Sequence, residues 1–479
     1  MAIKLQNIQF DQIVDDTFLR IDAKYHLFVE QSHWIVFPKT DIEKQVPLSK
    51  ILTPCFVTYN FEEGEMYRGV PTGRDYIDED GYITNYLNIT SENCPDRIKY
   101  AITPSNILIS SIRLAVTPAL NFEGLSDIEN YVFSNGYYIF NVRKGYLKKY
   151  VLYLLRSKRI KKVLDSSIYR GIGISSYKIN DFMRIMVPEI DINTQKVILD
   201  RIEPLEKELL KLKQRIILDK DIINTIITKT FNLDIEELNR LDKMKFLSIN
   251  SHDLAEGGTE LRDSVRFTKM RLLQQEMMRY YDDYMTLDEC LLEPKTQNGW
   301  SPENNELDGQ TKLLGIDSLH FNGVLTTDNP KFTNETREDI NNFYVKNGDF
   351  FVSRGNTVDL VALASIAENV EEDILYPDIM IKLFVDETKI DKQFLVYMFN
   401  SIIGRLYFKY ASKGKQQTMV KVSSDTIRNF VIPKISLDKQ RKIVKEIRKL
   451  SDKQNEIRGK IKNLRNDIDT IIETSMNIS

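Results

Sequence analysis

The chain has 479 residues, enough for about three domains, and 42 % hydrophobic with 28 % charged residues is typical of a globular protein. No stretch approaches the ~18 apolar residues of a membrane span and the N-terminus has no signal-peptide core, so we expect a cytoplasmic protein with no membrane partner. The formal net charge of −3 excludes a histone-like polybasic protein but permits local basic patches.

Cysteine and histidine are sparse. The three cysteines and four histidines are spread along the chain without the spacing of metal ligands. The sequence therefore predicts neither disulfides nor a structural zinc site, while a metal site built on carboxylates alone stays open.

Residues 1–186 are predicted to form a mixed α/β domain. Runs rich in β-branched and aromatic residues at 107–111 and 137–142 indicate strands, and a helix is expected at about 146–164. From Tyr131 to Leu164 there is no acidic residue, while nine lysines and arginines fall inside. Such a basic stretch indicates either a solvated helix face or a surface for phosphates.

A long helix is predicted for residues 187–230. Apolar residues there alternate in steps of three and four, and only Asp219 interrupts the seam: Ile198, Ile202, Leu205, Leu209, Leu212, Ile216, Ile223 and Ile226. This narrow heptad seam is typical of a coiled coil rather than of a helix packed on its own domain, where a broader apolar stripe is expected.

The second half repeats this order. A linker is predicted at 231–260, a second mixed α/β domain at 261–431, with strands at 350–353 and 379–385 and a helix at about 392–410, and a second coiled-coil helix at 432–479. Its seam is broken only by Gln454: Ile443, Ile447, Leu450, Ile457, Ile461, Leu464, Ile468 and Ile471.

The two halves are tandem copies. VPEIDINTQK, which begins at Val187, reappears as IPKISLDKQR from Ile432, so that Pro188 corresponds to Pro433 at an offset of 245 residues. The segments 152–157 and 396–401, and 105–111 and 348–354, correspond at almost the same offset. We therefore expect an α+β tandem duplication whose two long helices pair as an antiparallel coiled coil.

Catalytic motifs are not found. There is no phosphate-binding loop, nucleophile elbow or methyltransferase glycine loop, and Asn329-Pro330 lacks the second proline of a methyltransferase tetrad. Pro377-Asp378 and Glu387 have the letters of a metal nuclease, but the continuous strand predicted between them would hold the carboxylates about 30 Å apart. The chain is therefore expected not to be an enzyme.

DNA contacts are predicted from the duplicated basic stretches and the polar loops that follow them. The second stretch, from Lys392 to Ser424, is again free of acidic residues. The candidate DNA-binding residues in these stretches and loops are Arg170, Lys413, Lys415, Gln416, Gln417, Lys158, Arg159 and Lys409, and Arg354 and Asn356 are added because they follow the repeated strand at 350–353. Arginine and glutamine can contact guanine and adenine edges, and lysine can pair with phosphate.

This layout resembles the DNA specificity subunits of type I restriction-modification systems. GDFFVSR at 348–354 and the weaker SNILISS at 105–111 are similar to a signature of their target recognition domains. The prolines and glutamines before each long helix, and the opening at Arg20–Tyr25, also resemble the family pattern. In the second copy Thr268 stands where the first has Asp22, and the usual Glu-Gln pair is reduced to Thr194-Gln195 and Lys439-Gln440.

The resemblance implies a non-catalytic DNA-binding subunit. Each recognition domain would read one half of a split, asymmetric site in double-stranded DNA, and the paired helices would set the spacer and dock two methyltransferase (modification) subunits. Restriction/translocase subunits would join them. The resemblance also implies that this chain binds no cofactor, and that S-adenosylmethionine, ATP and Mg²⁺ act on the partner subunits.

Two other classes remain open. One is a tandem coiled-coil adaptor that binds proteins, which would lack a steep salt dependence of DNA binding. The other is a cryptic DNA-modifying enzyme with degenerate motifs, which would show activity with Mg²⁺ or S-adenosylmethionine alone.

Overall fold

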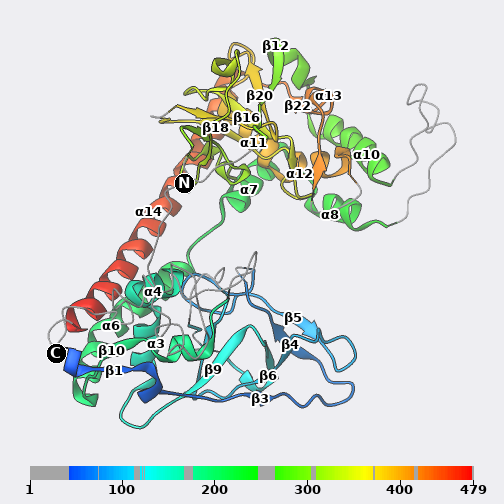
Figure 1. The fold of residues 1–479 in the computed structure, drawn as a ribbon. Helices are drawn as coiled ribbons and strands as arrows, with labels where there is room; N and C mark the ends of the chain where they lie inside the picture. Colours follow the sequence, from blue (N-terminus) through cyan, green and yellow to red (C-terminus); the bar gives the residue numbers. More distant parts are fainter. Residues whose placement is uncertain are drawn as a thin grey trace. The chain divides into compact units, whose positions relative to one another are not determined.

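The computed structural model describes residues 42–73, 75–112, 119–120, 122, 125–166, 176–245, 265–303, 309–370, 373–414 and 419–476. The chain divides into two compact units (Figure 1). The first unit comprises Ala2–Gln214 with Gly459–Ser479, and the second comprises Arg215–Arg458. Both units mix helices with small sheets, so the predicted α+β class with a tandem layout is confirmed.

The first unit has two main sheets. One has the order β2-β9-β7 and the other β3-β6-β8-β4-β5, while β1 pairs with β10. The strands are β1 (Gln45–Pro47), β2 (Leu52–Pro54), β3 (Val57–Thr58), β4 (Tyr67–Val70), β5 (Leu87–Ile89), β6 (Ile98–Ala101), β7 (Asn106–Ser110), β8 (Tyr131–Ser134), β9 (Tyr137–Val142) and β10 (Met186–Pro188). The helices are α3 (Lys148–Arg156), α4 (Lys158–Ser166), α5 (Ile179–Met183) and α6 (Ile192–Lys213), with short turns η1 (Ile42–Lys44), η2 (Leu48–Lys50) and η3 (Ile128–Asn130).

The second unit is built around the sheet β12-β20-β16-β18-β14, with smaller sheets β15-β13-β19, β11-β22 and β17-β21. Its strands are β11 (Tyr284–Thr286), β12 (Leu291–Asn298), β13 (Thr311–Leu313), β14 (Val324–Leu325), β15 (Lys331–Thr333), β16 (Phe350–Ser353), β17 (Gly355–Asn356), β18 (Ala364–Ala367), β19 (Ile374–Leu375), β20 (Met380–Val385), β21 (Val420–Lys421) and β22 (Val431–Pro433). Its helices are α7 (Asp219–Phe231), α8 (Ile235–Lys243), α10 (Val265–Tyr280), α11 (Lys392–Asn400), α12 (Ile402–Ala411) and α13 (Ser424–Arg428), with turns η4 (Leu287–Cys290), η5 (Ile316–Ser318) and η6 (Ile340–Phe343).

The repeat predicted from the sequence is present in the strand pairing. The antiparallel pair β7–β9 has Ile107 opposite Phe140, and β16–β20 has Phe350 opposite Leu383, both shifted by the same 243 positions. The pairs β1–β10 and β11–β22 likewise place Pro188 and Pro433 in equivalent positions. The four predicted strands are confirmed, because runs of apolar residues of strand length fill the centre of each sheet.

Each predicted basic helix is two helices in the structure. Helix α3 ends before Ser157 and α11 ends before Ser401, and α4 and α12 begin directly afterwards. Both serines are buried with an extended backbone, and the Ser401 hydroxyl donates to the Met398 carbonyl at 2.8 Å. The apolar period continues across both breaks, so it could not reveal them.

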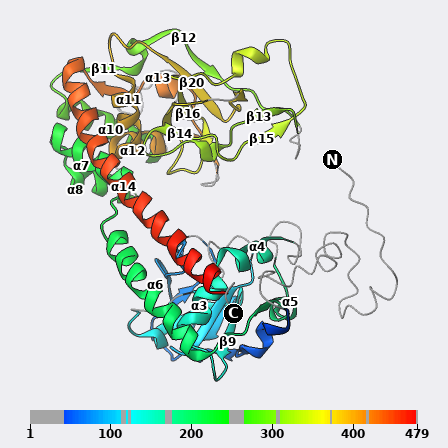
Figure 2. The ribbon, with the colours of Figure 1, turned by 90° about the vertical axis from the view of Figure 1, so that its left-hand side faces the viewer.

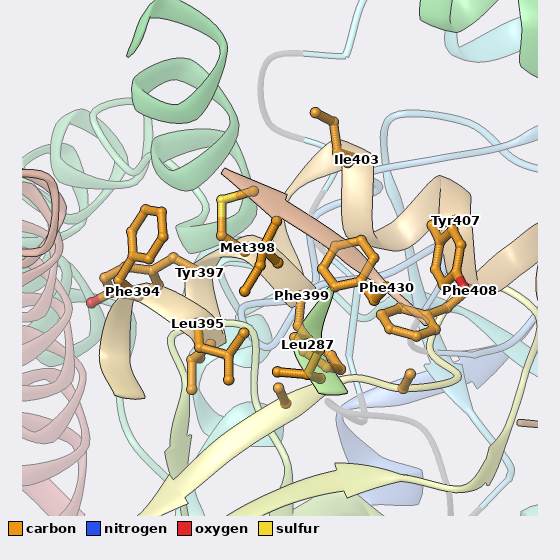
Figure 3. Close-up of a cluster of buried hydrophobic side chains, with 14 of the residues drawn as sticks. Leu287, Phe394, Leu395, Tyr397, Met398, Phe399, Ile403, Tyr407, Phe408 and Phe430 are labelled. Atoms are coloured by element: carbon orange, nitrogen blue, oxygen red, sulfur yellow. The ribbon is translucent and has the colours of Figure 1, made fainter. Parts of the chain in front are cut away.

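An aromatic core fixes α11 and α12 in the second unit (Figure 3). The ring of Phe399 lies 4.9 Å from Phe408 and 5.3 Å from Phe430, centroid to centroid, and these rings are almost fully buried. Phe350 of β16 lies 5.9 Å from Phe399, which joins the helix pair to the sheet. Burial of a ring of this size typically stabilises a fold by about 1.5–3 kcal/mol, so this cluster holds the surrounding loops on a rigid base.

The long helices differ from the prediction in one respect. The helix expected at 187–230 is interrupted at residues 214–218, between α6 and α7, whereas α14 (Leu437–Met476) is continuous. The two polar residues that break the heptad seams lie at this interruption within the second unit. Gln454 accepts a hydrogen bond from the Ile217 amide at 3.0 Å, and Asp219 pairs with Arg458 at 3.1 Å. The interruption leaves the Ile217 amide outside the helices, and Gln454 satisfies this donor.

Both units use part of α14. In the first unit Ile198 and Ile202 of α6 share a core with Ile472, near the end of α14 (Figure 2). In the second unit α7 shares a core with Ile443 and Ile447, near the start of α14. Among the described residues, no helix has the length and apolar character needed to cross a membrane.

Candidate nucleic-acid interface

Strand β16 of the second unit ends at a cluster of polar side chains. The Arg354 amide donates to the Ile379 carbonyl at 2.7 Å, and the Val422 amide donates to the Arg354 carbonyl at 2.9 Å. Asn356 follows on β17, which pairs with β21, so that Gly355 lies opposite Lys421. Lys413 and Lys421 exchange two backbone hydrogen bonds at 2.8 and 2.9 Å. The structure thus brings Arg354, Asn356 and Lys413 together, although they lie up to 59 positions apart.

Asp378 and Ser301 complete this cluster, which we call the second reading edge: Ser301, Arg354, Asn356, Asp378, Lys413 and Lys421. The Ser301 hydroxyl donates to Asp378 Oδ1 at 2.6 Å and accepts from the Asp378 amide at 3.1 Å. Arg354 Nη1 lies 3.4 Å from the Asp378 carbonyl oxygen. The two lysines are exposed, while Arg354 and Asp378 are half-buried. Cations, an amide and a carboxylate therefore lie near one another at the end of β16, and these are the groups that read base edges.

The first unit has the same backbone scaffold at the end of β7. Ser111 donates its amide to the Gly136 carbonyl at 2.9 Å and accepts from the Tyr177 amide at 3.2 Å, as Arg354 does with Ile379 and Val422. Ile112 pairs with Ser176 where Gly355 pairs with Lys421. We call this the first reading edge: Ser111, Ile112, Asn135 and Ser176. It carries uncharged side chains where the second edge is charged, and Ser111 is buried with its hydroxyl donating to the Gly136 carbonyl at 2.8 Å.

A group of aromatic side chains lies beside the first reading edge, and one of them is exposed. Phe56 is 44 % exposed, and its ring is 5.4 Å from Tyr100 and 6.5 Å from Tyr138. The Tyr138 hydroxyl donates to the Tyr177 carbonyl at 2.8 Å, which connects the aromatic group to the scaffold. Sequence reasoning missed Phe56. The available signal was an aromatic residue directly before Val57, and both side chains are exposed in the structure.

Three predicted DNA-binding cations are paired within their own unit. Lys158 Nζ lies 3.3 Å from Asp469, Arg159 Nε lies 3.7 Å from Glu473, and Lys409 Nζ lies 3.0 Å from Asp242. DNA contact by these residues stays a prediction, and it would require these ion pairs to open. Arg170, Lys415, Gln416 and Gln417, and the opening at 20–25, lie outside the described residues.

Gln195 and Gln440 perform the same task in both units. Gln195 Oε1 accepts from the Leu147 amide at 2.8 Å, and Gln440 Oε1 accepts from the Asp391 amide at 2.7 Å. Their Nε2 groups donate to the carbonyls of Ile190 and Ile435, at 2.8 and 2.9 Å. Both side chains are fully buried. Each glutamine therefore fixes the start of a basic helix pair to the start of a long helix, which explains the glutamine in the repeated motif.

An ionic network is built into the first unit. Arg465 donates two hydrogen bonds to the Asp80 carboxylate, at 2.8 and 2.7 Å, and Lys213 Nζ lies 2.9 Å from the same group. Asp78 and Glu79 pair with the same two cations. Burial by itself raises the pKa of Asp80, but Arg465 and Lys213 outweigh it and hold the pKa below its usual range. The loop at 78–80 is thus fastened to α6 and to the end of α14.

The predicted coiled-coil residues are mostly removed from solvent. Those that are buried are Ile198, Ile202, Leu209, Leu212, Ile443, Ile447, Ile461 and Leu464. Leu205, Ile216 and Ile457 are half-buried, and Leu450 is 37 % exposed. This burial fits helix seams that pack on apolar partners within each unit.

Residues able to hold a metal ion do not gather in the described parts of the chain: no group of three or more histidine, cysteine, aspartate or glutamate side chains is found there. Asp378 and Glu387, the pair considered for a nuclease, stand on either side of β20, which is one continuous strand as predicted.

Comparisons with known proteins gave matches among solved structures alone: no family model matches the chain and no curated protein matches it. The solved structures that resemble it include the following three. One concerns complex assembly and conformational transition of the type I R-M system, at 13 % identity and a TM-score of 0.39. The HsdS subunit from Thermoanaerobacter tengcongensis has 14 % identity and a TM-score of 0.33. The Type-I restriction-modification system S subunit from M. genitalium has 12 % identity and a TM-score of 0.38. Each match covers 90 % of this chain and 97 %, 96 % and 95 % of the respective relative.

Proposed function

We propose that this chain is the DNA specificity subunit of a type I restriction-modification system. One observation carries the proposal: the same hydrogen-bonded scaffold occurs twice, in the same register, with different side chains at its reading edge. Two equivalent sites that differ in chemistry suit a DNA target made of two different half-sites. Each unit's recognition domain reads one of them in double-stranded DNA.

Base contacts and phosphate contacts divide between different residues. Arg354, Asn356 and Asp378 can reach base edges, whereas the exposed Lys413 and Lys421 stand beside them and can pair with phosphate. Phosphate contacts fix the register of the protein on the duplex, and base contacts then specify sequence. On this proposal the backbone hydrogen bonds between Lys413 and Lys421 hold the phosphate-binding lysines next to the residues that contact bases.

The long helices set the spacer between the half-sites and dock two modification subunits. In support, the start of α6 shares a core with the end of α14, and α7 shares a core with the start of α14, as expected for an antiparallel pair. Helix α14 has 40 residues and is about 60 Å long. A rod of this length serves as a ruler along nearly two turns of DNA, at about 34 Å per turn.

The chemistry resides on the partner subunits. S-adenosylmethionine is bound by the modification subunits, and ATP and Mg²⁺ by the restriction/translocase subunits that join them. This chain is non-catalytic and supplies sequence recognition.

A base-resolution map of modified bases tests the proposal. Genomic DNA is compared from cells that express the modification subunit with and without this chain. We expect a split motif with a fixed spacer to become methylated only when the chain is present. Identical maps, with both proteins shown to be expressed, would contradict the proposal. Activity of the purified chain alone with Mg²⁺ or S-adenosylmethionine would favour an enzyme instead.

A further inference from the structure

The second reading edge holds an arginine and a carboxylate in fixed positions side by side. Arg354 directly follows β16, and Asp378 lies two residues before β20, the neighbouring strand. Because Ser353 is paired with Met380, the ends of these two strands meet, and Arg354 and Asp378 both lie just beyond them. Arg354 Nη1 lies 3.4 Å from the Asp378 main-chain oxygen, so the guanidinium contacts Asp378 through its backbone.

Ser301 orients the carboxylate. Its hydroxyl donates to Asp378 Oδ1 at 2.6 Å and accepts from the Asp378 amide at 3.1 Å, so the carboxylate is held from two sides. Among the described residues, Oδ2 of Asp378 has no hydrogen-bond partner. A half-buried carboxylate with one oriented oxygen left over is an acceptor ready for an amino group.

We propose that Arg354 and Asp378 read one G·C base pair from its major-groove edge. The proposal rests on the proposed function above and names the chemistry that its second site recognises. Guanine presents two acceptors, N7 and O6, which match two donors of a guanidinium, and the adjacent cytosine presents the N4 amino group, which matches a carboxylate. These three groups lie in a row across the pair, as the arginine and the carboxylate lie side by side on the protein.

Other base pairs fit this arrangement less well. An A·T pair offers its amino group and its O4 acceptor in a different order, and the thymine methyl group adds an apolar surface beside the carboxylate. The first reading edge has Ser111 and Asn135 at the equivalent positions, so it cannot make the same pair of contacts. The G·C requirement therefore belongs to one half-site alone.

Methylation maps from cells that contain the modification subunit test this assignment. The wild-type chain is compared with Arg354→Gln, Arg354→Lys, Asp378→Asn and Ser301→Ala. We expect the wild-type motif to contain an invariant G·C pair in one half, and Arg354→Gln and Asp378→Asn to relax the preference there by about tenfold or more. Ser301→Ala should relax it less, because Ser301 is a positioning residue, and Arg354→Lys should retain part of the guanine preference.

Controls separate folding from reading. Arg279→Gln and Asp438→Asn, at side chains 75 % and 92 % exposed on the same unit, should leave the map unchanged. The half-site read by the first unit should persist in every variant, which shows that the chain folds and assembles. If Arg354→Gln abolished all methylation, Arg354→Lys would be the deciding variant. A motif that keeps part of the guanine preference supports the assignment, and a motif that loses it completely overturns the assignment.

The outcomes distinguish the two proposals. A wild-type chain that guides no methylation overturns both. A wild-type split motif that stays unchanged in Arg354→Gln and Asp378→Asn overturns the G·C assignment and leaves the specificity role standing.

Discussion

The first and second reading edges share a backbone and differ in chemistry. At the first, Ser111 and Ser176 stand beside an aromatic group that includes Phe56; at the second, Arg354, Asp378 and Lys421 bring charge to the same positions. The main-chain hydrogen bonds correspond at the two edges, whereas the side-chain hydrogen bonds differ: the Ser111 hydroxyl donates to the Gly136 carbonyl at the first edge, and Ser301 bonds to Asp378 at the second. The comparison teaches that the duplicated part of this molecule is the support, whereas the part exposed to a ligand has diverged.

The largest expected effect concerns the two buried glutamines, which join the helices of each unit. Gln440→Leu removes the buried partner of the Asp391 amide and of the Ile435 carbonyl, and Gln195→Leu does the same in the first unit. Each substitution should lower the free energy of unfolding by about 2–4 kcal/mol, because buried polar groups are left unsatisfied.

Urea denaturation measures this loss. Lys439→Ala and Lys196→Ala are matched controls, since each is exposed and adjacent to the glutamine, and they should change stability by less than about 0.5 kcal/mol. If one of the two glutamine substitutions lowered the free energy of unfolding strongly and the other did not, the two glutamines would not be equivalent.

The next effect separates the units by pH. Because the pKa of Asp80 is lowered in the folded first unit, its carboxylate stabilises the fold above its unfolded pKa of about 4, and this contribution is lost as pH falls toward the folded pKa. Asp80→Asn should cost about 1.5–3 kcal/mol at pH 7 and much less near pH 3.

Hydrogen exchange at both pH values can follow the two units separately. The stability of the first unit should become less dependent on pH in Asp80→Asn, while the second unit should be unaffected. Equal pH dependence of the first unit in wild type and variant would show that the Arg465–Asp80 contact contributes nothing.

A smaller effect distinguishes exposed from paired cations. Lys413→Ala and Lys421→Ala should each weaken DNA binding by about tenfold and reduce the slope of log K against log salt by about 1, because each removes a phosphate contact. Lys158→Ala and Lys409→Ala should leave that slope unchanged, since these lysines already pair with Asp469 and Asp242.

Binding titrations of the assembled complex with its methylated motif, at three or more salt concentrations, provide the slopes. The same loss of slope in all four variants would mean that the ion pairs open on DNA. The basic helices would then be contact surfaces, as the sequence alone suggests.

The smallest effect is expected at the aromatic group. Phe56→Ala should reduce affinity by about threefold, and for the first half-site alone, because an exposed ring can pack on a thymine methyl group. Competition with DNA altered in one half-site at a time measures it. If Phe56→Ala reduced affinity for the second half-site instead, Phe56 would not contribute to the first reading edge.

Periodic features were predictable from the sequence. The strands at 107–111, 137–142, 350–353 and 379–385 were found, since apolar runs of strand length dominate their local energetics. The interruption at 214–218 was not, because the 3-4 spacing continues through it and the hydrogen bond from Ile217 to Gln454 joins residues 237 positions apart. Tertiary contacts of this kind leave no local signal.

The candidate site was predictable in part. Arg354, Asn356 and Lys413 were chosen because they follow repeated motifs, and the structure brings them together. Asp378 was considered only as a metal ligand, and Ser301 was not considered at all. Strand pairing and loop geometry bring both residues to the site, and the sequence does not show these contacts. Lys158 and Lys409 were chosen for charge, and the sequence could not show the carboxylates that they face.

The main-chain anchoring of Ser111 and Arg354 has a consequence for how such a protein changes over generations. Arg354 is secured by its own amide and carbonyl and its side chain is half-buried, so a single codon change there can alter what is read while the main-chain hydrogen bonds persist. Selection can therefore act on each half-site separately, and a lineage can acquire a new target sequence without passing through an unfolded ancestor.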